Sequence, residues 1–132
     1  MGKDRIRTMI IGLGVDLVKV DRIKEIVDRW NNRFLERVFT AVELEYCWSK
    51  SLAPQHLAAR FAAKEAALKM LGTGLKGLNW HQFEVENDPG GKPVLKLYGR
   101  ARELARKKGI KAIHLSISHE REYAFAQVIG EG

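Results

Sequence analysis

Four charged side chains lie in a segment of the chain that is otherwise apolar. Residues 57–71 contain only Ala, Leu, Phe and Met, apart from Arg60, Lys64, Glu65 and Lys69. The pattern leaves no solvated face and Pro54 suits a helix start, so we expect a long buried helix over residues 54–70. Burying an unpaired ion is costly, so these four charges must be paired, bind a metal or face a ligand cleft.

Glu65 and Lys69 are four residues apart and therefore share one face of the expected helix. A Glu65–Lys69 pair on a solvated surface is the simplest interpretation, but it fits poorly with the surrounding alanines, which let other elements approach closely. The helix is followed by Gly72, Thr73 and Gly74. These residues form either an ordinary C-terminal cap and turn or a loop that passes close to a ligand.

Two other segments carry side chains that could do chemistry. Asp16 ends an apolar run at residues 9–17, where its carboxylate either caps the following helix or belongs to a functional site. In residues 114–119 (HLSISH), strand alternation places His114, Ser116 and Ser118 on one face and His119 on the other. No nucleophile elbow surrounds either serine, which argues against a Ser–His hydrolase.

The elements that position these residues follow from periodicity and from turn residues. We expect strands at residues 9–17, 80–87, 92–98, 112–119 and 122–129, and helices at residues 20–30, 54–70 and 99–108. Thr40 and Glu43 form a capping box that opens a further helix to about residue 50, after a possible helical turn at residues 34–39. The order β-α-α-α-β-β-α-β-β predicts an α+β fold, with a small, mainly antiparallel sheet packed with the long buried helix.

Length and composition narrow the classes of function. The 132 residues are expected to form a single domain, and residues 1–8 a polar leader outside it. The net charge of +7 points to an anionic partner. The single cysteine, Cys47, allows no intrachain disulfide and is expected to be a packed, inert thiol in a cytoplasmic protein. No apolar run has the length of a membrane span.

Three blocks of the sequence together resemble the signature of the 4′-phosphopantetheinyl transferases, in their short bacterial form. The blocks are residues 14–23 (GVDLVKVDRI), 61–74 (FAAKEAALKMLGTG) and 115–119 (LSISH). They occur in the family's order, and the resemblance covers residues 9–129. Met70 stands where the family usually has alanine, on the packing side of the helix, where it should not affect chemistry.

The resemblance implies an enzyme that transfers 4′-phosphopantetheine from coenzyme A to a serine of apo acyl carrier protein and releases adenosine 3′,5′-bisphosphate, in fatty acid biosynthesis. By analogy, Asp16 and Glu65 would hold Mg²⁺, and Glu65, or a metal-bound water that it orients, would be the base for the attacking serine. Lys69, and with less support Lys64, would neutralise charge on the diphosphate. The backbone amides of Gly72, Thr73 and Gly74 would approach the nucleotide.

The same resemblance implies partners and further contacts. Arg60 and His119 would contact a phosphate or the ribose. Lys19, Arg22 and Arg29 would form a basic face that docks the acidic carrier protein. The short members of the family are homotrimers with active sites at subunit interfaces, and no membrane partner is expected. The alternative left by the net charge is a non-catalytic module that binds nucleic acid, although no RNP motif, zinc finger or helix-turn-helix is recognisable.

Overall fold

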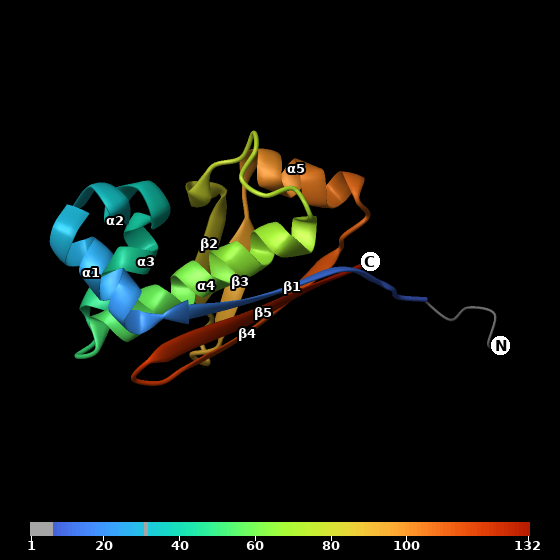
Figure 1. Ribbon diagram of the computed structural model, residues 1–132. Coiled ribbons are helices and arrows are strands. Elements are labelled where there is room, and N and C mark those ends of the chain that lie inside the picture. The colour runs from blue at the N-terminus through green and yellow to red at the C-terminus, as the bar shows by residue number, and fades with distance from the viewer. Residues whose placement is uncertain (1–6, 31) are drawn as a thin grey trace.

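The structure is a computed structural model that describes residues 7–30 and 32–132 of the chain. Figure 1 shows α1, α2 and α3 gathered at one end of the molecule, α5 at the other end, and α4 running between them along the three-stranded sheet. In chain order the described elements are β1 (Ile10–Lys19), α1 (Val20–Trp30), α2 (Asn32–Val38), α3 (Ala41–Trp48), α4 (Ala53–Leu71), the 3₁₀ helix η2 (Trp80–Gln82), β2 (Phe83–Asn87), β3 (Pro93–Leu97), α5 (Gly99–Lys107), β4 (Ala112–His119) and β5 (Tyr123–Glu131).

The strands form two antiparallel sheets, one of three strands in the order β1-β5-β4 and one of two strands, β2-β3. This confirms the α+β class and the antiparallel pairing, but the strands do not form the one sheet that we expected. Helix α4 contacts β1, β5 and β4 on the larger sheet and β2 on the smaller one. The long helix is buried because both sheets and two other helices, α1 and α3, pack against it.

Strand β1 approaches α4 so closely that only glycine fits at two positions. A Cβ atom at Gly14 would lie 2.0 Å from the carbonyl oxygen of Ala66, and one at Gly12 would lie 2.2 Å from the carbonyl oxygen of Met70. The alanines of α4 therefore do what the sequence predicted and allow close backbone approach. Met70 is 4% exposed, which confirms its place on the packing side of the helix.

Two elements have the predicted boundaries, most others lie within one or two residues of the prediction, and three regions differ in a way that matters for the fold. Helix α1 and strand β4 have the predicted bounds, and the capping box is present, with Thr40 N donating to Glu43 Oε1 at 2.9 Å. Residues 80–82 form a 3₁₀ helix before β2, and residues 32–38 form α2, which the predicted order lacked. Strand β1 pairs with β5 as far as Lys19, opposite Tyr123, and Asp16 pairs with Ala126, so Asp16 lies within the strand and does not cap α1.

Three further expectations concern the core and the termini. Cys47 is fully buried, and burial raises the pKa of its thiol to about 11, as expected for an inert thiol. Among the described residues, no helix combines the length and apolar character needed to span a bilayer. The expected polar leader covers residues 1–8, of which the first six lie outside the described residues.

Candidate active site

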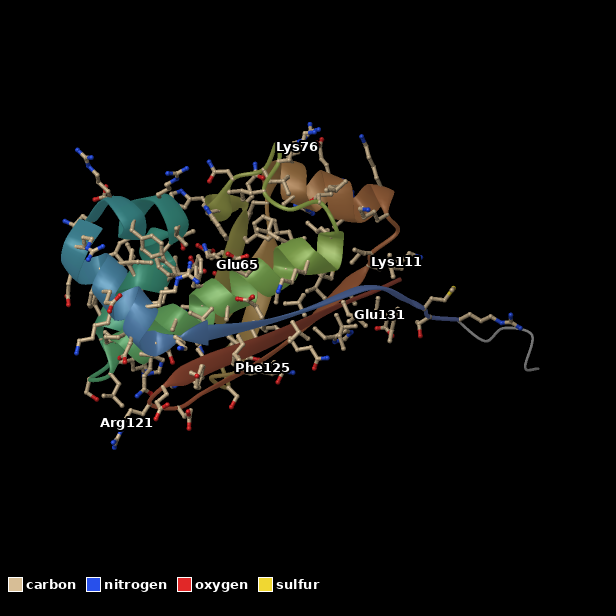
Figure 2. All side chains as sticks on the ribbon, viewed as in Figure 1. Glu65, Lys76, Lys111, Arg121, Phe125 and Glu131 are labelled. Atoms are coloured by element: carbon tan, nitrogen blue, oxygen red, sulfur yellow. The ribbon has the colours of Figure 1, made fainter. Side chains whose placement is uncertain are left out.

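A cleft of about 440 Å³ opens at the C-terminal end of α4. Glu65 and Lys69 contribute to its lining from the helix, and Figure 2 shows Glu65 projecting from α4 near the middle of the molecule. Trp80 contributes to the lining from η2. The remaining lining residues are Leu68, Gly72, Gly74 and Leu75.

The Gly-Thr-Gly turn ends α4 and forms one edge of this cleft. Gly72 adopts a left-handed conformation with φ of 76° and donates its N–H to the carbonyl oxygens of Leu68 and Lys69, which is a C-terminal cap. Gly74 also has a positive φ, of 61°. The Thr73 hydroxyl donates to the Gly74 carbonyl at 3.1 Å. The turn is therefore a helix cap, and it also lines the cleft.

Lys69 links α4 to strand β1. Its Nζ atom lies 3.1 Å from Asp16 Oδ1 and donates to the Val15 carbonyl at 2.9 Å. Asp16 reaches the helix because it lies on the same face of β1 as Gly14, where the strand and helix backbones are closest. Lys69 therefore pairs with Asp16, not with Glu65 on its own helix, and its side chain remains 55% exposed.

Glu65 lies in an environment that disfavours its charged form. Burial raises the pKa of the Glu65 carboxyl, and the negative charge of Asp16 raises it further, while Lys69 and Arg22 act in the opposite direction. The sequence brought Asp16, Glu65 and Lys69 together by analogy, and the structure places all three at this end of α4. Within the described residues, no group of three or more His, Cys, Asp or Glu side chains has metal-site geometry.

Lys64 does not face the cleft, and our expectation of a ligand contact there is corrected. Its side chain is fully buried and its Nζ atom lies 2.6 Å from Glu43 Oε1. The same ammonium group donates to the carbonyl oxygens of Val38 at 2.7 Å and Trp80 at 3.2 Å. All three of its N–H groups thus have acceptors inside the protein. The sequence had assigned Glu43 only to the capping box.

Arg60 lies on another side of α4. It is 3% exposed, its Nη2 atom donates to Asn87 Oδ1 at 2.7 Å, and its guanidinium lies over the Tyr46 ring, 4.0 Å from the centroid. The Nε atom has no hydrogen-bond partner among the described residues. No carboxylate forms an ion pair with Arg60 in the described part of the chain, so a buried positive charge is left without a counter-ion.

His119 belongs to the same region as Arg60. Its Nδ1 atom lies 3.2 Å from Gln55 Oε1, and its ring centroid lies 4.7 Å from that of His56. Burial lowers the pKa of His56, and the nearby positive charges of His119, Arg60 and Lys50 lower it further. We call this second site the Arg60 cluster. It consists of Arg60, His119, His56 and Lys50. Sequence reasoning missed His56 and Lys50, which only the tertiary structure brings beside Arg60.

The Arg60 cluster and the cleft lie on different faces of the same helix. Five residues separate Arg60 from Glu65, which corresponds to a rotation of about 140° around the helix axis. Arg60 and His119 therefore lie apart from Asp16, Glu65 and Lys69 within this chain.

The expected docking residues Lys19, Arg22 and Arg29 are all exposed. Arg22 and Arg29 share one shallow hollow on α1, whereas Lys19 lies in another hollow. The α1 hollow adjoins a larger groove of about 460 Å³, lined by Ile26, Arg33, Phe34 and Arg37. Sequence reasoning missed this groove, although the four-residue spacing of Arg33 and Arg37 on one helical face was a signal for it.

Comparison with known proteins identifies the family. Residues 12–128 match the model of the 4′-phosphopantetheinyl transferase superfamily. A holo-(acyl-carrier-protein) synthase of Halothermothrix orenii is 53% identical over 123 residues, covering 93% of this chain and 98% of that protein. The crystal structure of the Neisseria meningitidis holo-(acyl-carrier-protein) synthase is 34% identical, with a TM-score of 0.85, covering 94% of this chain and 100% of that one.

A third relative was solved with a ligand. The holo-(acyl-carrier-protein) synthase of Bacillus anthracis, in complex with coenzyme A (3′,5′-ADP), is 37% identical with a TM-score of 0.77, and the match covers 94% of this chain and 98% of that one. The chain therefore belongs to the 4′-phosphopantetheinyl transferase superfamily and, within it, to the enzymes called holo-(acyl-carrier-protein) synthases.

Proposed function

We propose that this chain transfers the 4′-phosphopantetheine group from coenzyme A to a serine hydroxyl of an apo acyl carrier protein, with Mg²⁺, and releases adenosine 3′,5′-bisphosphate. The observation that carries the proposal is that Glu65 and Lys69 line one cleft and that Asp16 lies beside them, in a chain of this family. The relatives are named holo-(acyl-carrier-protein) synthases, and one of them was crystallised with coenzyme A. We assign the reaction to fatty acid biosynthesis in the cytoplasm.

The proposed reaction exchanges one phosphorus–oxygen bond for another. The serine Oγ atom bonds to the phosphorus that carries pantetheine, and the bond from that phosphorus to the adenosine-side phosphate breaks. Glu65, or a water that it orients, accepts the serine proton. Lys69, more than half exposed, can offer its positive charge to the diphosphate oxygens.

Asp16 and Glu65 are the residues that would hold Mg²⁺. They supply two carboxylates close enough for the charge of Asp16 to raise the pKa of Glu65, and a divalent cation relieves that repulsion. Two carboxylates completed by substrate phosphates and water suit the oxygen shell of Mg²⁺. Once bound, the ion would neutralise charge on the diphosphate.

We propose that the Arg60 cluster binds a phosphate of the coenzyme A nucleotide, with His119 as a second contact. A buried guanidinium without a counter-ion is stabilised by an anionic ligand, and Lys50 adds to the positive charge there. Because the cluster and the cleft lie on different faces of α4, one ligand reaches both only if they come from different subunits. Each active site would then combine the cleft of one subunit with the Arg60 cluster of another.

The outer face of the three-stranded sheet is the surface that we propose for trimer formation. On this face Leu13 is 55%, Leu17 61% and Phe125 38% exposed, and Leu17 pairs directly with Phe125. Figure 2 shows Phe125 on the edge of the molecule formed by this sheet. A contiguous apolar patch of this kind is typical of a subunit interface. We therefore propose a homotrimer with interfacial active sites.

The groove on α1 and α2 is the proposed docking surface for the carrier protein. It combines an apolar floor, Ile26 and Phe34, with the exposed cations Arg33 and Arg37, and it adjoins Arg22 and Arg29. Such a surface is complementary to an acidic protein that also presents apolar side chains. Replacing Arg33 and Arg37 with glutamate should raise the KM for the carrier protein and leave the KM for coenzyme A unchanged. An unchanged KM for the carrier would contradict the docking role.

The transfer reaction is tested by incubating the protein with apo carrier protein, coenzyme A and Mg²⁺ and measuring the mass of the carrier. We expect a phosphopantetheine adduct to form without EDTA and not to form when EDTA is present from the start. Asp16→Asn and Glu65→Gln should each abolish it while the circular dichroism spectrum stays unchanged. Glu103→Gln, which removes an exposed carboxylate on α5, is the matched control and should retain full activity. If the wild-type protein forms no adduct, the proposed function is wrong.

A further inference from the structure

The buried ion pair between Glu43 and Lys64 makes hydrogen bonds to several different helices and strands. Glu43 Oε1 accepts from Thr40 N at 2.9 Å, and its Oε2 atom accepts from Val85 N at 2.8 Å. Lys64 donates to the carbonyl at the end of α2 and to the Trp80 carbonyl at the start of η2. One buried pair therefore joins α2, the N-terminus of α3, α4, β2 and η2.

Stability alone does not explain a pair with this geometry. A buried ion pair is often no more stabilising than apolar side chains of similar volume, because both ions lose their hydration. Fully satisfied polar networks do fix the relative positions of the elements that they join. Both side chains here are fully buried, and each polar atom of Lys64 and Glu43 has at least one partner.

Of the residues that line the cleft, Trp80 is one that this ion pair holds in place. The Trp80 carbonyl accepts from Lys64, while Trp80 itself lines the cleft together with Glu65 and Lys69. Its ring packs on Phe61 of α4 with centroids 5.5 Å apart. On the exposed side, His81 of η2 contacts the Glu36 carbonyl at 2.6 Å, whereas Lys64 donates a hydrogen bond to η2 from the core.

Lys64 and Glu65 are adjacent on α4 and point in directions about 100° apart. The first side chain enters the core and holds the Trp80 carbonyl. The second lines the cleft, to which Trp80 also contributes. The distance between Glu65 and Trp80 therefore depends on the hydrogen bond that Lys64, the neighbour of Glu65, donates to the Trp80 carbonyl.

We propose that Lys64, held by Glu43, is a positioning residue that sets the width of the cleft by fixing Trp80, which lines the cleft together with Glu65 and Lys69. The inference rests on the proposed function of this cleft as the site for the coenzyme A diphosphate. Lys64 acts through Trp80 and touches no reacting atom. Its loss widens the cleft and makes the positions of the bound diphosphate less well defined.

The test compares two variants with a matched control. Lys64→Met keeps the length of the side chain and removes its donors, but leaves the Glu43 carboxylate buried without its cation. Glu43→Gln combined with Lys64→Met also removes that charge, so it should fold more readily. Ile110→Ala is the control because it destabilises the core at a buried position outside the network and outside the cleft.

Two readouts are needed, and one of them is independent of activity. The first is kcat/KM for coenzyme A, measured in the carrier mass assay at a temperature where each variant is folded. The second is acrylamide quenching of Trp80 fluorescence. The chain has three tryptophans, so Trp30 and Trp48 are first replaced by phenylalanine to leave Trp80 alone.

We expect both variants to lose about 100-fold in kcat/KM for coenzyme A, since an error of about 1 Å in positioning has an effect of this size. Trp80 should become more quenchable in both, while Ile110→Ala changes neither readout at equal loss of thermal stability. Normal Trp80 quenching and normal kcat/KM in a folded variant would overturn the proposal, as would an equal loss in Ile110→Ala.

Failure of both variants to fold would also overturn it, because the pair would then serve folding alone. Inactivity of the wild-type protein would refute the proposed function but leave the quenching result as a separate test.

Discussion

Replacing Gly14 with alanine should damage both stability and catalysis, because the added methyl group has no space between β1 and α4. The new Cβ atom would lie 2.0 Å from the Ala66 carbonyl oxygen and 2.8 Å from the Met70 amide nitrogen. Both are backbone atoms, so no side-chain rotation relieves the clash. Cβ atoms essentially never approach a heavy atom within 3.0 Å, so the strand and helix must separate by at least 1.0 Å.

The size of each effect follows from that displacement. Overpacking a well-packed core costs about 1–3 kcal/mol, and the upper part of that range applies because two backbones must move. Asp16 lies two residues beyond Gly14 on the same strand face, and its carboxylate lies 3.1 Å from Lys69 Nζ. Moving Asp16 by about 1 Å relative to Glu65 and Lys69 should lower the rate of transfer about 100-fold.

The assay measures the free energy of unfolding by urea denaturation and the rate of carrier modification at a temperature where the variant is folded. Gly90→Ala is the matched control. Gly90 lies in the turn between β2 and β3, and a Cβ atom there meets only the Asp88 side chain, at 3.4 Å. We expect the control to change stability by less than about 0.5 kcal/mol. The reasoning fails if Gly14→Ala keeps both wild-type stability and wild-type activity.

Two further predictions concern the charges of the site. The pKa of Glu65 is raised in the folded chain, so its folded form holds the proton more tightly and stability falls as pH rises above the ordinary value of 4.5. Without Mg²⁺, Glu65→Gln should therefore stabilise the protein at pH 7, by at most about 1 kcal/mol because the group is partly solvated, and the gain should vanish near pH 4 in thermal melts. A gain of equal size at both pH values would contradict this assignment. If active sites are shared between subunits, mixing inactive Asp16→Asn and Arg60→Met proteins and allowing their subunits to exchange should restore about a quarter of the activity. No restoration in verified mixed oligomers would show that both residues act within one subunit.

The sequence predicts most of the helices and the central part of the site because those features depend on local patterns. The long buried helix follows from composition and periodicity, and the Thr40–Glu43 capping box follows from residues three apart. That Glu65 and Lys69 lie on the same face of this helix also follows from the sequence, because residues four apart in a helix share one face. The position of Asp16 beside Lys69 required the family resemblance, since 53 residues separate them.

The features that the sequence does not predict depend on contacts between distant residues. The division into two sheets is set by strand pairing, and in the described part of the chain β2 and β3 pair with each other and with no other strand. The partner of Lys64 is Glu43, on another helix, and the capping role of Glu43 gave no sign of a second one. The cations around Arg60 come from separate elements, with His119 on β4 and Lys50 in the segment after α3.

The four charges of α4 show how tertiary structure separates structural ions from functional ones. Burial alone does not distinguish them, since Lys64 and Arg60 are both almost completely buried. Lys64 has every donor satisfied inside the protein, so it has no capacity left for a ligand and can only fix other groups in place. Arg60 retains a buried Nε atom without a partner, and Glu65 retains a carboxyl group whose ionisation the protein opposes. A buried polar group without a partner, or a carboxyl group held in a poorly solvated place, is costly to the folded chain. In the function that we propose, a cation bound at Glu65 and a phosphate bound at Arg60 would remove that cost.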